Sequence, residues 1–589
     1  MAESVNSGGG DPNRPPQEMS MEVRLLLAFL LMGAVMFLTP YFFKTAAPPP
    51  PVKKAEQAAP GPVGTPPQPA AEMVPPAPVA EEAKAEHPAR KGSTKAVPSA
   101  PSTPQKVEPA FVVATDLFTV AFSNQGATVR SWRLKKYRGN DGKDLELVNV
   151  AAGLEYPFSL YFPDKQPASK VNWTYYTQTP DPDALGVAYA FSDGHTLVHK
   201  VFRFEKNSYL LHVSTEVETD GQAVPHFIQW RGGFGDFTVT SAVANQRTLY
   251  FDVTQNKLVE QRASAAKNGP VTASGNFSFA GIADTFFAAV VLPEGSTAVQ
   301  AMTFSDTVRT TFEEKPAPFV GAAVSDGATN RFALFIGPKD VDLLKRINPK
   351  LEQVVDFGWL SFLAKPLFLI VNWFNDAFVH NFGWSIVVVT IVINTILFPL
   401  RLSNMKSMKK MQALKPQIDA INAKYKNISL RDPKKADQNQ EVMALYKRYG
   451  VNPMGGCVPM LIQLPFFIAF YKVFNVSVEM RGATWLWVTD LSQPETLPIH
   501  ILPLIMIVSQ FLMQKMTPQA TADPNQQRMM MFMPLIFGFM FYNFASGLVL
   551  YYLTSNLVSV GQQWFFNHTA LADAAAESVA LPKKKNGRK

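Results

Sequence analysis

The stretch Asn381–Arg401, NFGWSIVVVTIVINTILFPLR, decides the architecture of this chain. About 20 mostly apolar residues are enough for one helix to cross a bilayer. Thr390 and Asn394 lie one helical turn apart in the middle of this stretch and therefore share a face. Arg401 follows two turns later, close to the same face. Because polar groups at that depth are costly unless they face partners or water, the stretch predicts a helical bundle with a wet side. Interhelical hydrogen bonding without a further role is the alternative interpretation.

The composition excludes several classes of protein. The chain has 589 residues and a formal net charge of +8, too long for one ordinary domain. Because the basic excess lies next to apolar segments, it indicates membrane orientation rather than a nucleic-acid groove, and we expect no DNA partner. The single cysteine, Cys457, permits neither an intramolecular disulfide nor a cysteine-based metal site. Walker A and dinucleotide glycine patterns are missing from the sequence, so we expect neither a cofactor nor nucleotide-driven work.

The N-terminal part predicts an anchor and a tether. Residues 1–24 lead into an apolar segment of spanning length at 25–43. The apolar core of this segment is longer than that of a cleaved signal peptide, so we interpret it as an uncleaved transmembrane helix. Residues 46–108 are rich in proline and alanine and almost free of aromatic residues. Such a composition cannot bury enough apolar surface to fold, so it predicts a disordered linker.

Residues 110–340 predict an all-β domain. Strand-like alternation of apolar and polar residues occurs, with turn residues between, in Leu117–Phe122, Thr128–Leu134, Val198–Phe204 and Tyr209–Val217. Helical periodicity is nearly absent, so a large β-sandwich is expected. The histidines, His195, His199, His212 and His226, are too scattered to suggest a metal site. Trp173, Trp230 and Asp236 would suit a carbohydrate-binding face, although buried aromatic residues are the commoner explanation.

The C-terminal half predicts membrane helices interrupted by a basic hairpin. The apolar but interrupted segment 358–380 is typical of an amphipathic helix in the membrane interface, and transmembrane helix 2 follows at 381–401. Residues 402–452 predict a helical hairpin whose apolar stripe includes Met405, Met408 and Met411. This stripe either packs within the hairpin or forms a docking surface for apolar clients. Four further spans are expected at 455–478, 499–515, 528–545 and 548–567, before a basic tail at 568–589.

The distribution of lysine and arginine predicts the orientation of these spans. The basic hairpin belongs in the cytoplasm by the positive-inside rule. The β domain and the loop Glu479–Pro498 are then outside, whereas both termini and the segment Met516–Gln527 are inside.

Five segments of the C-terminal half resemble the YidC membrane-protein insertases. They are NPMGGCVPMLIQLPFFIAFYKVF (452–474), LWVTDLS (486–492), FLMQKMTP (511–518), DPNQQRMMMFMPLIF (523–537) and FASGLVLYYLTSNL (544–557). The stretch TDLFTVAFSNQGATVRSWRL (115–134) also resembles the start of the large periplasmic domain of Gram-negative members. The resemblance implies a multi-pass inner-membrane protein with a five-helix core, an N-terminal anchor helix and a periplasmic β-super-sandwich.

The resemblance also implies a function. Members of the family insert and help to fold integral membrane proteins, alone or with the Sec translocon, and they are not enzymes. Clients pass through a hydrophilic groove open to cytosol and lipid. The groove of the family usually carries an arginine on the second span, where this sequence has Asn394, while Thr390 and Tyr552 match other groove positions. We hypothesise that Arg401, about 10 Å further along the helix, reaches back to supply this charge. The alternative is that Arg401 anchors the helix end among lipid headgroups.

The candidate groove residues are polar side chains on the predicted spans: Thr390, Asn394, Arg401, Gln463, Gln510, Gln514, Tyr552, Ser555 and Ser559. The candidate docking residues for clients are methionines on the cytoplasmic side: Met405, Met408, Met411, Met454 and Met530. The expected partners are nascent membrane proteins, the Sec translocon and membrane lipids. The basic tail and hairpin suit ribosomal RNA and anionic lipid equally well.

Two rival functions make different predictions. A secondary transporter would show inverted repeats and paired broken helices around a midplane site, and the sequence shows no repeat. A sugar-modifying enzyme on a membrane anchor would require clustered carboxylates and a histidine in the β domain.

Overall fold

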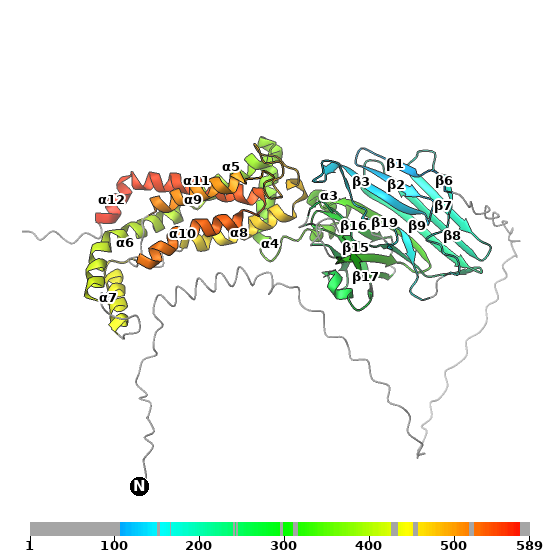
Figure 1. The fold of residues 1–589 in the computed structure, drawn as a ribbon, viewed down its shortest axis with the longest axis horizontal. Helices are drawn as coiled ribbons and strands as arrows, with labels where there is room; N and C mark the ends of the chain where they lie inside the picture. The colour runs from blue at the N-terminus through cyan, green and yellow to red at the C-terminus, as the bar shows by residue number, and fades with distance from the viewer. Residues whose placement is uncertain are drawn as a thin grey trace, which may run out of the picture. The chain divides into compact units, whose positions relative to one another are not determined.

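The computed structural model describes residues 107–577 apart from 150–152, 165–166, 240–241, 243–244, 295–297, 310–315, 426–433, 452–457 and 518–523. The strands form one body and the long helices another (Figure 1). The predicted anchor at 25–43 and nearly all of the predicted linker at 46–108 lie outside the described residues.

The β domain contains three antiparallel sheets. The first has the order β1-β2-β3-β4, with β1 Phe111–Ala114, β2 Phe118–Ser123, β3 Thr128–Arg138 and β4 Asp144–Glu146. The second has the order β13-β12-β15-β16-β19-β9-β8-β7-β6, and β10 (Gln222–Ala223) pairs with β9. The third has the order β14-β17-β18-β11-β5.

The strands of the second sheet are β6 Thr177–Pro180, β7 Gly186–Ser192, β8 Thr196–Phe204, β9 Leu210–Thr219, β12 Arg247–Asp252, β13 Lys257–Gln261, β15 Phe277–Ala283, β16 Phe287–Pro293 and β19 Thr329–Pro338. Those of the third are β5 Ser159–Tyr161, β11 Phe227–Trp230, β14 Val271–Gly275, β17 Val299–Val308 and β18 Ala317–Ser325. The short helix η1 spans Ala263–Ala266.

The burial of these strands follows from their sequence pattern. Along β8 buried residues alternate with more exposed ones, as a strand with one face on the core requires. β18 is instead buried over seven consecutive residues, which indicates that both of its faces are covered. One of its faces packs against β15 of the second sheet, so these two sheets form a sandwich. The predicted β domain and its four predicted strands are confirmed.

Two short helices, α3 (Val341–Ile347) and η2 (Leu351–Val354), leave the β domain. The remaining elements are helical: α4 Ser361–Phe374, η3 Asn375–Val379, α5 Phe382–Ile396, α6 Phe398–Lys424, α7 Lys434–Arg448, α8 Val458–Val476, η5 Val478–Met480, α9 Ile501–Met516, α10 Pro524–Phe541, α11 Ser546–Asn567 and α12 Ala570–Glu577. Helices α8 to α11 occupy the four stretches in which further spans were predicted.

The prediction of one continuous helix over 381–401 is wrong. The helix ends at Ile396, and α6 begins at Phe398 with a bend of 59°. Pro399 explains the break, because it lacks the N–H that would bond to the carbonyl of Thr395 and its ring crowds that carbonyl. Arg401 therefore lies on a different helix from Asn394.

Length and composition identify few membrane spans among the described residues. One helical stretch, Ser361–Val379, is long and apolar enough to cross a bilayer, and the bent pair of α5 and α6 qualifies as a second if counted as one span. The shorter Ile501–Met516 is also apolar. Ser361–Val379 coincides with the segment predicted to lie in the interface, and its length and composition alone permit crossing.

Helix α11 is the centre of the helical body. It packs against α9, α5 and α8, and α4 packs against α8 and α5. More than half of the residues of α11 are buried, among them the polar Ser555, Ser559 and Gln563. This arrangement gathers polar side chains of several helices around α11.

Residues 421–444, where the helical hairpin turns, belong to a different compact unit from the other described residues. Glu441 of α7 accepts hydrogen bonds from Lys424 (3.3 Å) and Tyr425 (2.9 Å). Gln438 donates a hydrogen bond to Asn422 at 2.7 Å. These contacts pair the end of α6 with α7, as the predicted hairpin requires.

Candidate functional site

A polar cleft lies between α5, α6, α8 and α11. Part of its wall is apolar, and the cleft is lined by Ile393, Asn394, Leu397, Leu400, Arg401, Asn404, Gln463, Phe466, Tyr551 and Ser555. The bend at Leu397 directs α6 so that Arg401 faces the same cleft as Asn394. Amide, hydroxyl and guanidinium groups therefore meet on an otherwise apolar surface.

Asn394 is buried and hydrogen-bonded on three sides. Its Oδ1 accepts a hydrogen bond from Oγ of Ser555 at 3.2 Å, and its Nδ2 donates to the carbonyl of Thr390 at 2.8 Å. Its backbone carbonyl accepts from Nε2 of Gln562 at 3.1 Å. Asn394 therefore joins α5 to Ser555 and Gln562, which lie two turns apart on one face of α11.

Arg401 is held by neutral oxygens. Its Nη1 donates to Oγ of Ser559 and to Oε1 of Gln562 (3.4 Å), and its Nη2 donates to Oε1 of Gln463 (3.4 Å). Nε2 of Gln463 in turn donates to Oγ of Ser555 at 3.2 Å. Among the described residues no carboxylate lies within ion-pair distance of Arg401. The guanidinium thus brings a positive charge into the cleft that its direct partners do not neutralise.

Five of the predicted groove residues belong to this network. They are Asn394, Arg401, Gln463, Ser555 and Ser559. Arg401 and Asn394 thus line the same cleft, from two helices separated by a bend rather than from one continuous helix.

The other predicted groove residues are not among the residues that line the cleft. Thr390 is fully buried, and its hydroxyl donates to the carbonyl of Ile386 at 2.6 Å. The ring of Tyr552 packs against Phe541, with 4.9 Å between ring centres. Gln510 and Gln514 are on α9 and half-buried, and neither is among the lining residues.

Sequence reasoning missed three polar residues: Asn404 and Tyr551, which line the cleft, and Gln562, which bonds to Arg401 and Asn394. Gln562 could have been found, because it continues the three- and four-residue spacing of Ser555 and Ser559. Tyr551 and Tyr552 both match that spacing, four and three residues before Ser555, and only packing distinguishes them.

The predicted docking methionines differ in exposure. Met405 and Met408 are half-buried on α6. Met411 is 4 % exposed and lies in line with the buried Leu414 and Ile418, so its side chain packs inside the protein. Met454 and the side chain of Met530 lie outside the described residues.

The idea of a carbohydrate-binding face in the β domain is wrong. Trp230 is buried and donates its indole N–H to the carbonyl of Gly233 at 3.1 Å. Asp236 is fully buried and paired with Arg481, while only Trp173 is exposed. A sugar could not reach two of the three side chains.

Comparisons with known proteins cover nearly the whole of the described chain. The family model described as "60Kd inner membrane protein" matches residues 373–573, and the model described as "YidC periplasmic domain" matches residues 110–370. A protein of Geotalea daltonii named "Membrane protein insertase YidC" is 34 % identical over 500 residues, covering 81 % of this chain and 90 % of that protein.

A protein of the same name from Pelobacter propionicus is 31 % identical over 579 residues, covering 93 % of this chain and 99 % of that protein. The solved structure titled "Active YidC insertase crystal structure with the first transmembrane domain resolved" is 21 % identical, with a TM-score of 0.35. The match covers 80 % of this chain and 95 % of the chain in that crystal structure. The two sequence relatives and the two family models are sufficient to assign the family.

Proposed function

The chain belongs to the YidC family of membrane protein insertases, and on that premise we propose that its cleft between α5, α6, α8 and α11 carries the polar part of a client into the membrane. The protein inserts membrane proteins and is not an enzyme. The observation that supports this use of the cleft is a chain of hydrogen bonds that runs from Arg401 through Gln463 and Ser555 to Asn394.

The physical task is to move a polar segment through hydrocarbon. A charged side chain at the bilayer centre costs about 3 kcal/mol or more. A cleft with water and hydrogen-bond partners lowers that cost over part of the path. The apolar segment of the client can then leave sideways into lipid, where burial supplies the free energy. No nucleotide is needed for this sequence of steps.

Arg401 takes over the positive charge that relatives with an arginine at the Asn394 position would carry there. Its guanidinium lies among Ser559, Gln562 and Gln463. Gln562 also donates to the backbone carbonyl of Asn394, and Gln463 donates to Ser555, which bonds to Asn394. Because its partners are neutral, Arg401 can attract an acidic residue of the client. Asn394 keeps the neighbouring part of the cleft polar without adding charge.

The orientation follows from the charge distribution. The β domain lies in the periplasm, and the helical hairpin with both termini lies in the cytoplasm. The pairing of Arg481 with Asp236 supports this arrangement, because it joins the loop after α8 to the β domain on one side of the membrane. The half-buried Met405 and Met408 would meet the client first.

Nascent membrane proteins and lipids are the partners that this function implies. The Sec translocon is a further partner in our proposal, and the ribosome is another, bound through the basic tail and hairpin. The Gram-negative inner membrane is the site of action.

Arg401→Ala tests the proposed role of the charge. Removal of the guanidinium should slow insertion of a client whose translocated segment contains acidic residues, by about tenfold if the lost interaction is near 1.4 kcal/mol. The measurement is protease protection of that client in inverted membrane vesicles, and Arg401→Lys should keep part of the activity.

Arg331→Ala is the matched control, because it removes the same charge from an exposed position of β19 in the β domain. It should insert the client as the parent does. If Arg401→Ala inserts the acidic client normally while Asn394→Leu abolishes insertion, polarity matters in the cleft and the proposal for Arg401 is wrong.

A further inference from the structure

The segment 477–493, which follows α8, contacts the β domain and also α5 and α11, two of the helices that line the cleft. It contains η5 and the motif Ala483–Ser492, whose turn is closed by paired hydrogen bonds between Trp485 and Val488 at 2.8 and 2.9 Å. A short segment with contacts to three separate elements can fix their relative positions.

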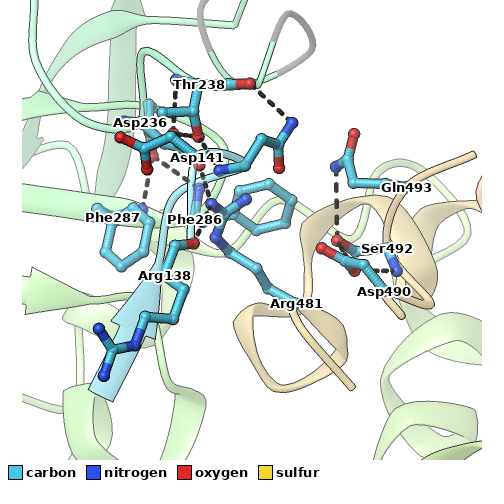
Figure 2. A network of polar contacts seen from close by, with 12 residues as sticks. Arg138, Asp141, Asp236, Thr238, Phe286, Phe287, Arg481, Asp490, Ser492 and Gln493 are labelled. Atoms are coloured by element: carbon cyan, nitrogen blue, oxygen red, sulfur yellow. Dashed lines mark hydrogen bonds and ion pairs between the residues drawn. The ribbon is translucent and has the colours of Figure 1, made fainter. Parts of the chain in front are cut away.

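Arg481 is the contact with the β domain (Figure 2). Its Nη2 pairs with the carboxylate of Asp236 and donates to the backbone carbonyl of Arg138 at 3.0 Å. Its guanidinium lies 5.5 Å from the ring centre of Phe286. The side chain of Arg481 is 3 % exposed and that of Asp236 is fully buried. The ion pair is therefore an interior contact rather than a surface one.

The β domain holds Asp236 ready for this contact. Oδ1 of Asp236 accepts hydrogen bonds from the backbone N–H of Thr238 (2.8 Å) and from its hydroxyl (2.6 Å). The backbone N–H of Asp236 donates to Asp284 at 2.7 Å. These bonds leave the second carboxylate oxygen directed at Arg481. Loss of one partner would leave a buried charge without compensation, which is far more costly than loss of a surface pair.

The same segment holds the end of α5. Nδ2 of Asn381, which caps α5, donates to the carbonyl of Thr484 at 3.0 Å. The ring of Trp485 covers Gly383, where an added Cβ would lie 2.3 Å from Trp485 Cδ1. Trp384 and Trp485 also pack edge to face, with 5.6 Å between ring centres. Only glycine at 383 permits this close approach.

The N-terminal end of α11 is also held by hydrogen bonds to residues of this segment. The backbone N–H of Gly547 donates to the carbonyl of Leu491 at 2.9 Å. Ser546 donates to the carbonyl of Gln493 through its backbone N–H at 2.8 Å and its hydroxyl at 2.9 Å. These bonds satisfy donors in the first turn of α11, which a helix cannot satisfy by itself.

From these contacts we propose that residues 477–493 form an interdomain clasp, through which the β domain fixes the spacing of α5 and α11 and thereby the shape of the cleft. Arg481 is the positioning residue of the clasp and touches no client. The inference rests on the proposed function insofar as the cleft formed by α5 and α11 carries clients. Any load or partner that moves the β domain would act on the cleft by way of Arg481.

Distances between spin labels in the full chain in nanodiscs test the clasp. One pair joins Val201 of the β domain to Val392 of α5, and a second joins Ile391 of α5 to Leu557 of α11; all four positions are exposed. Cys457→Ser serves as the background. Arg481→Gln and Asp236→Asn should broaden both distance distributions and lower insertion, whereas Arg331→Gln, at an exposed position of β19, should leave them as in the parent.

The double variant tests whether Asp236 and Arg481 act through one shared contact or whether each substitution perturbs the protein independently. Asp236→Asn combined with Arg481→Gln should be no worse than either single change, because both remove one contact. Hydrogen exchange of β8 and β9 in the Arg481→Gln protein should match the parent, which shows that the β domain stays folded. Unchanged distances between α5 and α11 in Arg481→Gln would overturn the clasp.

The same experiment separates this inference from the proposed function of the cleft. If Arg401→Ala inserts normally but Arg481→Gln still changes both distances, the clasp stands and the cleft does not carry the client's charge.

Discussion

At the scale of single residues, two cations of this protein have neutral oxygens as hydrogen-bond partners. One is the half-buried Arg401, and the other is the buried Lys200 of β8. Nζ of Lys200 donates to the backbone carbonyls of Gly126 (2.7 Å) and Phe158 (2.8 Å), and the side chain is fully buried. Burial lowers the pKa of Lys200 to about 7. Both side chains use carbonyl, amide or hydroxyl oxygens where a surface residue would use water.

Because of the buried His226, we expect acid to destabilise the folded β domain. Burial lowers its pKa to about 4, and its Nε2 and Nδ1 are engaged by Thr215 (2.8 Å) and the carbonyl of Val224 (2.9 Å). The folded state therefore favours the neutral ring, whereas the unfolded chain takes up a proton near pH 6.5. The free energy of unfolding should fall as the pH drops from about 6.5 to about 4, by up to about 3 kcal/mol.

Hydrogen exchange of the amides in β9 and β11, measured between pH 7 and pH 4.5 and corrected for the intrinsic rates, checks this prediction. His226→Gln should remove most of the acid-dependent loss. His212→Gln is the control, because His212 is half-exposed and the pKa of its ring is raised by hydrogen bonds to Glu205 and Glu294. An equal acid dependence in the parent and in His226→Gln would refute the assignment.

At the scale of elements, the break between α5 and α6 is what brings Arg401 to the cleft. Without the bend of 59°, two helical turns would separate Arg401 from Asn394 along a straight axis. Pro399→Ala restores the missing N–H and removes the ring that crowds the preceding turn. The variant should insert acidic clients as poorly as Arg401→Ala does.

Pro416→Ala is the control for this prediction, because Pro416 lies in the same helix beyond the bend. It should leave insertion of the acidic client unchanged. Normal insertion by Pro399→Ala, measured by the same protease-protection assay, would show that the bend is not needed to place the charge.

The helices and strands were the part of the structure that the sequence predicted best. Period-two alternation located strands such as β8 and β9, and long apolar runs located helices α8 to α11. The break at Leu397 was missed because Pro399 stands near the predicted end of the span, where a proline is usually tolerated. The choice between Tyr551 and Tyr552 could not be made because both fit the helical spacing and only tertiary packing decides between them.

At the scale of the whole molecule, the pairing of Arg481 with Asp236 joins parts of the chain that are far apart in sequence. No local pattern marks either residue, since a lone arginine after a span is also explained by lipid headgroups. The family resemblance supplied the function and the prediction of a groove. The residues that connect the β domain to the cleft became visible only in the structure.

The central claim is that the polar part of a client passes through the cleft. A photo-reactive residue placed at Asn394, with Ile391 on the exposed side of the same helix as the comparison, tests it against stalled nascent chains of increasing length. We predict adducts between position 394 and the polar segment of the client, at the lengths where that segment enters the membrane. Adducts at position 391 alone, with none at 394 for any length, would contradict the account.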